Sequence, residues 1–165
     1  LGYGLLFDRG RRSDTLGDVQ PTIRARLSVS RKLNRGWEAT TGVNADILSH
    51  KGGQVIDFGL GYERKLSPRF TWDVGFGLNW ASNRYMRSYY GVTPETSVSS
   101  GYPVYTPGAG WRDASASTQW RLELGSRWVS FWGASIGRTL GPAADSPTVS
   151  QIHQWSVTGG VARRF

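Results

Sequence analysis

The chain has 165 residues, with eight tryptophans, 22 glycines, no cysteine and a formal net charge of +8, so it suits one domain and excludes disulfides and thiolate sites. No segment approaches the roughly 20 apolar residues of a transmembrane helix, and a mean hydropathy of -0.40 is compatible with a transmembrane β-barrel, whose strands are half polar. The charge indicates an acidic partner, either anionic lipid, lipopolysaccharide or nucleic acid; without a nucleic-acid module signature we expect no nucleic acid.

Eight segments alternate large apolar residues with small or polar ones, which is the period-two pattern of β-strands. The clearest reads FTWDVGFGLNW at residues 70–80, with aromatic residues at both ends of its apolar face, as in a strand that crosses a bilayer. In chain order the predicted strands are 1–8, 18–32, 37–48, 55–66, 70–80 with an extension to Tyr85 left open, 112–124, 128–140 and 153–165. In the seventh, Val129 and Phe131 are out of phase with Trp132.

The connections between these strands alternate in length. Short ones fall at 34–36, 67–69 and 125–127, and long ones at 9–17, 49–54, 85–111 and 141–152. Bacterial outer-membrane barrels have short periplasmic turns and longer outer loops. Each short turn also places an arginine next to the aromatic residue that opens the following strand, and these pairs predict anchors at the periplasmic membrane interface. The pairs are Arg35 with Trp37, Arg69 with Phe70, and Arg127 with Trp128. The alternative is that these arginines are ordinary turn residues.

A soluble barrel that is apolar inside would show the same alternation. The many glycines, alanines and serines on the polar faces favour a narrow lumen, and charged residues are rare at mid-strand apolar positions, where a lipid-facing charge costs about 2–4 kcal/mol. The chain also ends on Phe165, which resembles the C-terminal signal of outer-membrane barrels, although Arg163 departs from that signal. We therefore predict an all-β fold: an antiparallel up-and-down transmembrane β-barrel of eight strands, forming a single domain over residues 1–165.

Several strings resemble the MipA/OmpV family of outer-membrane proteins. They are RYMRSYYGVTPET at 84–96 with 99–105 and 108–110, LGPAADSP at 140–147, the segments 8–12 and 16–18, and GGVARRF at 159–165. The resemblance implies the outer membrane of a Gram-negative bacterium, a removed signal peptide, and further strands before Leu1 that give ten or twelve in total. It also implies a non-enzymatic scaffold that joins a periplasmic murein hydrolase and a murein polymerase, while other family members are described as porins or adhesins.

The residues themselves predict no catalytic, cofactor-binding or metal site. Ser49 next to His50, or Ser150 near His153, would suit a lipid A-modifying barrel enzyme, but neighbours on a strand point to opposite faces, so we favour solvated histidines at the rim. The loop 85–111 is aromatic and predicts an ordered cap over the barrel mouth. At its feet, Arg84, Arg87 and Arg112 are candidate contacts for lipopolysaccharide phosphates, or simply keep the rim soluble. A small porin for polar solutes is the main alternative function.

Overall fold

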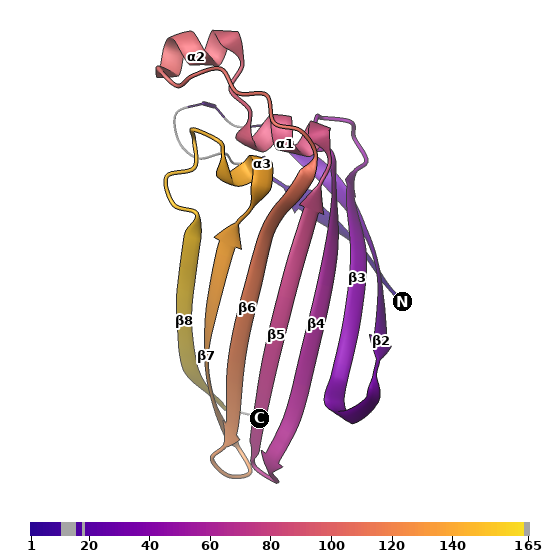
Figure 1. Ribbon diagram of the computed structural model, residues 1–165. Helices are drawn as coiled ribbons and strands as arrows, with labels where there is room; N and C mark the ends of the chain where they lie inside the picture. Colours follow the sequence, from indigo (N-terminus) through magenta and orange to yellow (C-terminus); the bar gives the residue numbers. More distant parts are fainter. Residues whose placement is uncertain (11–15, 18, 164–165) are drawn as a thin grey trace.

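The computed structural model describes residues 1–10, 16–17 and 19–163, so Phe165 and its proposed signal lie outside the described residues. The chain forms one antiparallel sheet in which the strands follow one another in chain order (Figure 1). The strands are β1 (Gly2–Asp8), β2 (Thr22–Lys32), β3 (Trp37–Asp46), β4 (Gln54–Ser67), β5 (Phe70–Ala81), β6 (Gly110–Glu123), β7 (Trp128–Thr139) and β8 (His153–Arg163). The predicted all-β, eight-stranded, up-and-down arrangement is confirmed.

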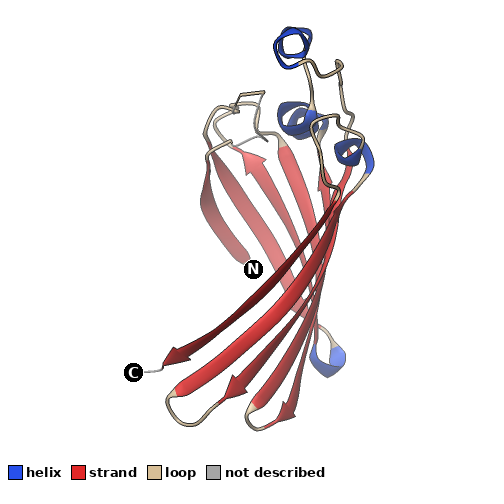
Figure 2. Ribbon diagram, turned by 90° about the vertical axis from the view of Figure 1, so that its left-hand side faces the viewer, coloured by secondary structure: helices blue, strands red, loops and turns tan. Residues whose placement is uncertain are grey.

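The sheet is curved like part of a barrel wall, which gives it a concave and a convex face (Figure 2). Strands β1 and β8 are its two edges. The short turns gather at one end of the sheet, here called the turn end, and the long connections gather at the other, the loop end (Figure 1). Within the described residues, no helix is both long enough and apolar enough to cross a membrane.

In the described part of the chain, four short helical segments lie outside the sheet. They are η1 (Asn34–Gly36) at the turn end, and α1 (Asn83–Tyr90), α2 (Pro94–Ser100) and α3 (Gly141–Ala144) at the loop end. The extension of the fifth strand to Tyr85 is therefore wrong, because β5 stops at Ala81 and α1 follows. The reason is local: the Ser82 hydroxyl accepts a hydrogen bond from the backbone N–H of Tyr85, which is the N-cap arrangement that begins a helix.

The loop that follows α1 is also ordered. Helix α2 begins with a capping box between Thr93 and Thr96 and ends at Gly101, whose φ of 76° is the left-handed conformation that glycine adopts most readily. Val92 and Tyr105 form a β-bridge that brings the two ends of the loop together. The structure thus gives the longest connection regular structure, as its aromatic residues predict.

Strand register explains the irregular pattern in β7. Trp132 lies opposite Trp120 of β6, while Phe131 lies opposite Arg121, so Trp132 is on the convex face and Phe131 on the concave one. A phenylalanine fits on the polar, concave face because its neighbour on β8 is Gly160, where an added Cβ would collide with the Phe131 ring. The out-of-phase position of Phe131 in the sequence of β7 is therefore explained by its pairing with Gly160 on the neighbouring strand.

A cap across the concave face at the loop end

Helix α1 crosses the concave side of the sheet at the loop end. The Tyr89 hydroxyl lies 2.8 Å from Asp8 Oδ2 on β1, and Arg112 of β6 donates a hydrogen bond of 2.9 Å to the Tyr85 hydroxyl. Because β1 and β6 lie far apart in the strand order, a helix that touches both must span the curve between them. We call residues 83–90 the α1 cap.

The cap packs on a small hydrophobic core. Met86 is fully buried together with Ala81, Ala143 and Val55, and Tyr85 and Tyr90 pack against this cluster. These residues come from α1, β5, α3 and β4, so the core joins segments that are remote in sequence. Burying a methionine side chain contributes about 1.5–3 kcal/mol, which is a large share of the stability of an eight-residue helix that is marginal alone.

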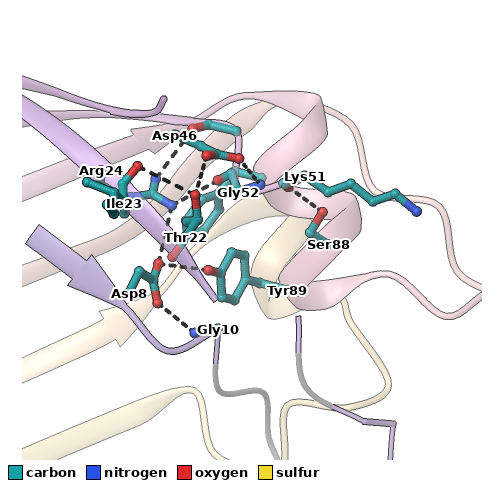
Figure 3. Close-up of polar contacts among 12 residues, drawn as sticks. Asp8, Gly10, Thr22, Ile23, Arg24, Asp46, Lys51, Gly52, Ser88 and Tyr89 are labelled. Carbon is teal, nitrogen blue, oxygen red and sulfur yellow. Dashed lines mark hydrogen bonds and ion pairs between the residues drawn. The ribbon is translucent and has the colours of Figure 1, made fainter. Parts of the chain in front are cut away.

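Arg24 is the central polar residue beneath the cap (Figure 3). It is 6% exposed, and its Nη1 lies 3.3 Å from Asp8 Oδ2 and 3.0 Å from the carbonyl oxygen of Gly52. Its guanidinium also lies 5.2 Å from the centre of the Tyr85 ring. Arg24 therefore connects β1, β2, the β3–β4 loop and the cap, and its buried charge is compensated by Asp8.

A β-bulge brings a second arginine to the same ring. Trp80 pairs with Trp111 and Asn79 pairs with Asp113, so Arg112 is the extra residue of β6. A bulge re-aims the side chain at its own position, and here Arg112 contacts Asp113 and lies 5.4 Å from the Tyr85 ring centre. Tyr85 is thus held by cations from β2 and β6, an arrangement worth about 0.5–2 kcal/mol per cation.

The β3–β4 loop beneath α1 is organised by one carboxylate. Asp46 accepts hydrogen bonds from the backbone N–H groups of Leu48, at 3.0 Å, and Gly52, at 2.8 Å, and from the Thr22 hydroxyl. The loop then receives the cap, because the Ser88 hydroxyl donates to the carbonyl oxygen of Lys51 at 2.6 Å (Figure 3). The cap therefore rests on a loop that is itself fixed to β2 and β3.

Burial changes the acidity of the tyrosines in the cap. Burial raises the pKa of Tyr90 to about 12, and burial together with the hydrogen bond to Asp8 raises the pKa of Tyr89 still further. Both phenols stay protonated at physiological pH, and the Tyr89 hydroxyl donates its hydrogen bond to Asp8. His50, in the β3–β4 loop, has Nδ1 2.8 Å from the Pro21 carbonyl oxygen, so its imidazole contacts the backbone there. The contacts of the cap hold α1 in place across the concave face at the loop end.

Below the cap the concave face is polar and internally paired. Arg26 and Asp57 form an ion pair of 2.8 Å, and Asn44 donates to the same carboxylate at 3.0 Å. Asn79 donates to Asp113 at 2.6 Å. The Arg26–Asp57 pair reaches across β3 from β2 to β4, whereas the other two contacts join neighbouring strands. Together they give Arg26, Asp57 and Asp113 polar partners on this face.

The three arginines predicted to meet lipopolysaccharide lie in different environments. Arg84 and Arg87 are exposed on α1, and Arg84 donates to the Ser49 carbonyl oxygen at 3.2 Å. Arg112 points instead under the cap, toward Tyr85. The structure therefore presents Arg84 and Arg87 to the surroundings and engages Arg112 in the cap, and contact with lipopolysaccharide stays a prediction.

The six predicted interface anchors all lie at the turn end. Arg35, Arg69 and Arg127 are exposed, and Arg35 has a φ of 61° within η1. Their aromatic partners join a row of rings on the convex face that sequence alone does not reveal, because it depends on register. The ring pairs are Trp37–Tyr62, Tyr62–Trp72, Phe70–Trp132 and Trp120–Trp132, with centroids 4.9–6.4 Å apart, and Trp128 lies 5.9 Å from the Arg163 guanidinium. Their role as anchors remains a prediction.

Comparison with known sequences supports one family. The profile of the family described as "MltA-interacting protein MipA" matches residues 1–165. Curated proteins named "MltA-interacting protein" from Escherichia coli (strain K12) and from Shigella flexneri are each 29% identical to the chain over 153 residues, which cover 91% of it. The chain spans 59% of the length of these relatives.

Proposed function

The chain belongs to the MltA-interacting protein MipA family, and we propose that it is the barrel domain of an outer-membrane protein that holds murein-processing enzymes in place without being an enzyme. The observation that carries the proposal is the family match along the whole chain together with the name of its relatives, which describes an interaction. A role linked to murein synthesis follows from that name; the scaffold itself, the outer membrane of a Gram-negative bacterium, and contact with membrane lipid are our proposals.

The two faces of the sheet support a membrane location. In the register of the eight strands, the side chains of the convex face between the two ends are uncharged, for example Phe58, Leu60, Phe76 and Leu78. Because a lipid-facing charge near the bilayer centre costs about 2–4 kcal/mol, an uncharged central band is expected where lipid covers the sheet. The aromatic row at the turn end then corresponds to one of the two interfacial girdles.

The two ends of the sheet support opposite roles. At the loop end the α1 cap closes the concave face, which argues against a wide pore there. At the turn end the exposed basic residues Arg35, Arg69 and Arg127 border the sheet and would face the periplasm, where a murein hydrolase works. An acidic surface on that hydrolase would be attracted to this rim, and such attraction mainly speeds and orients association.

Site-specific photocrosslinking tests the proposal. A photoreactive residue at position 35, 69 or 127 of the full-length protein is expected to crosslink a murein hydrolase of the MltA type, and the same group at Val98, which is 90% exposed on α2 at the loop end, is the matched control. Crosslinks that form only from position 98, or capture experiments that recover no murein enzyme, would refute the scaffold. Steady open-channel currents from the purified protein would favour the porin alternative instead.

A further inference from the structure

The convex face carries few charged side chains, and those present are basic. Strand alternation and register place five basic residues on this face of the described strands: Arg31, Arg64, Arg138, His153 and Arg163. Three of them lie at the turn end, while Arg138 and His153 lie together at the loop end. This second group forms an isolated arginine–histidine pair at the opposite edge of the uncharged band.

Arg138 and His153 face each other directly across β7 and β8. Directly opposed residues on one face have Cβ atoms about 4.5–5.5 Å apart, so the Arg138 guanidinium and the N–H of the His153 imidazole can reach one ligand. Among the residues that the structure describes, neither side chain has an ion pair or a hydrogen bond. An anion that binds between them would accept hydrogen bonds from both side chains and neutralise the arginine.

An apolar groove adjoins this pair. It has a volume of about 480 Å³ and is lined by the convex side chains of β6, β7 and β8 next to Arg138 and His153. Ala116, Ile136 and Trp155 form a continuous row across it, since Ala116 pairs with Ile136 and Ile136 with Trp155. The small alanine leaves the space, and the Ile136 and Trp155 side chains are 65% and 79% exposed. The groove thus offers an uncovered apolar surface next to the arginine–histidine pair.

An arginine and a second N–H donor next to an apolar groove are complementary to a phosphorylated acyl lipid. We propose that Arg138 and His153 bind a phosphate of lipid A, the membrane anchor of lipopolysaccharide, and that one of its acyl chains lies in the groove formed by Ala116, Ile136 and Trp155. The arginine supplies the planar donor fork that suits phosphate. The choice of lipid A rests on the proposed outer-membrane location, because the loop end then reaches the outer leaflet. This site is separate from Arg84, Arg87 and Arg112.

Lipid binding to the full-length protein in detergent, followed by native mass spectrometry, tests the site. The probes are bisphosphorylated lipid A, dephosphorylated lipid A and phosphatidylglycerol. The double variant R138A/H153A is expected to bind bisphosphorylated lipid A at least about tenfold more weakly, which corresponds to about 1.4 kcal/mol. Ala116→Phe fills the groove without changing charge and is expected to weaken binding similarly. Arg64→Ala removes a convex arginine at the turn end and is the matched control, with unchanged affinity.

Each outcome bears on one claim. Equal binding of phosphatidylglycerol and lipid A, equal binding of dephosphorylated lipid A, or unchanged affinity in R138A/H153A would overturn the site. Photocrosslinking to the murein hydrolase, run on the same double variant, is expected to remain at its wild-type level. A wild-type protein that crosslinks the hydrolase but shows no preference for lipid A would therefore count against this site alone. A wild-type protein that selects lipid A but fails to crosslink would count against the scaffold alone.

Discussion

Replacing Arg24 by alanine is expected to open the α1 cap. The substitution removes the hydrogen bond to the Gly52 carbonyl oxygen, the ion pair with Asp8 and the cation–π contact with Tyr85. The sheet keeps its backbone hydrogen bonds, because Arg24 takes part in the cap through its side chain alone. The cap and the β3–β4 loop should therefore loosen while the strands remain paired.

The magnitude follows from the three contacts. A hydrogen bond from a charged donor contributes about 1.5–3 kcal/mol, and the ion pair adds about 0.5–1 kcal/mol because the Asp8 side chain is 27% exposed. The cation–π contact adds about 0.5–1 kcal/mol. Because part of this loss is shared with the loop, we expect the free energy of cap opening to fall by about 2 kcal/mol, which corresponds to an open population about 30-fold larger.

Amide hydrogen exchange measures this opening directly. A peptide that covers α1 should exchange about 30-fold faster in Arg24→Ala, and peptides from the centres of β4 and β5 should be unchanged. Arg31→Ala is the matched control, since Arg31 is on the same strand but exposed at the turn end, and it should change exchange in α1 by less than twofold. A change below about threefold in Arg24→Ala, or an equal change in both variants, would refute the role given to Arg24.

Three further predictions concern the cap and the two faces. The pKa of Tyr90 is raised to about 12 in the folded protein, so the unfolded state loses this proton first as the pH rises. The free energy of unfolding should therefore fall between pH 10 and 12 by about 1.4 kcal/mol per pH unit. In Tyr90→Phe, the slope of the free energy of unfolding against pH in this range should be smaller by one proton than in the wild type. Gly53→Ala places a Cβ against the α1 backbone at a φ of 60° and should lower the urea midpoint by the equivalent of about 2 kcal/mol. Gly59→Ala, whose added Cβ would have its nearest neighbour at 3.8 Å, an ordinary contact distance, should change the midpoint little, and equal midpoints for the two variants would contradict the placement of α1. Phe76→Lys puts a charge on the convex face and should destabilise the protein in bilayers by about 2–4 kcal/mol. Phe131→Lys, on the concave face, is the control and should destabilise the protein less. The reverse order would mean that lipid does not cover the convex face.

The strands could be read from the sequence because their pattern is set by the backbone. Successive side chains of a strand point to opposite faces, so a single segment such as 70–80 already shows which residues share a face. The turns at 34–36, 67–69 and 125–127 are equally local, and their lengths fixed the antiparallel order. All eight predicted strands are present, with ends displaced by at most a few residues where the chain is described.

The α1 cap and the apolar groove beside Arg138 and His153 could not be predicted from the sequence pattern. Helix α1 depends on burying Met86 between β4, β5 and α3. An eight-residue segment has too little helical stability of its own for its sequence to predict a helix. The sequence does not distinguish Arg24 from other residues of the polar face. Its role depends on contacts with β1 and the β3–β4 loop that exist only in the folded protein. Arg138 and His153 are 15 positions apart and become a pair only through the register of β7 and β8.

The sequence by itself therefore determined the strands, their order and their two faces, because these follow from nearest-neighbour backbone geometry and from the length of each connection. The tertiary structure decided how the concave face is closed and where cations meet apolar surface. Both depend on contacts between residues that are distant along the chain, such as Asp8 with Tyr89, and only the curvature and register of the assembled sheet bring those residues together.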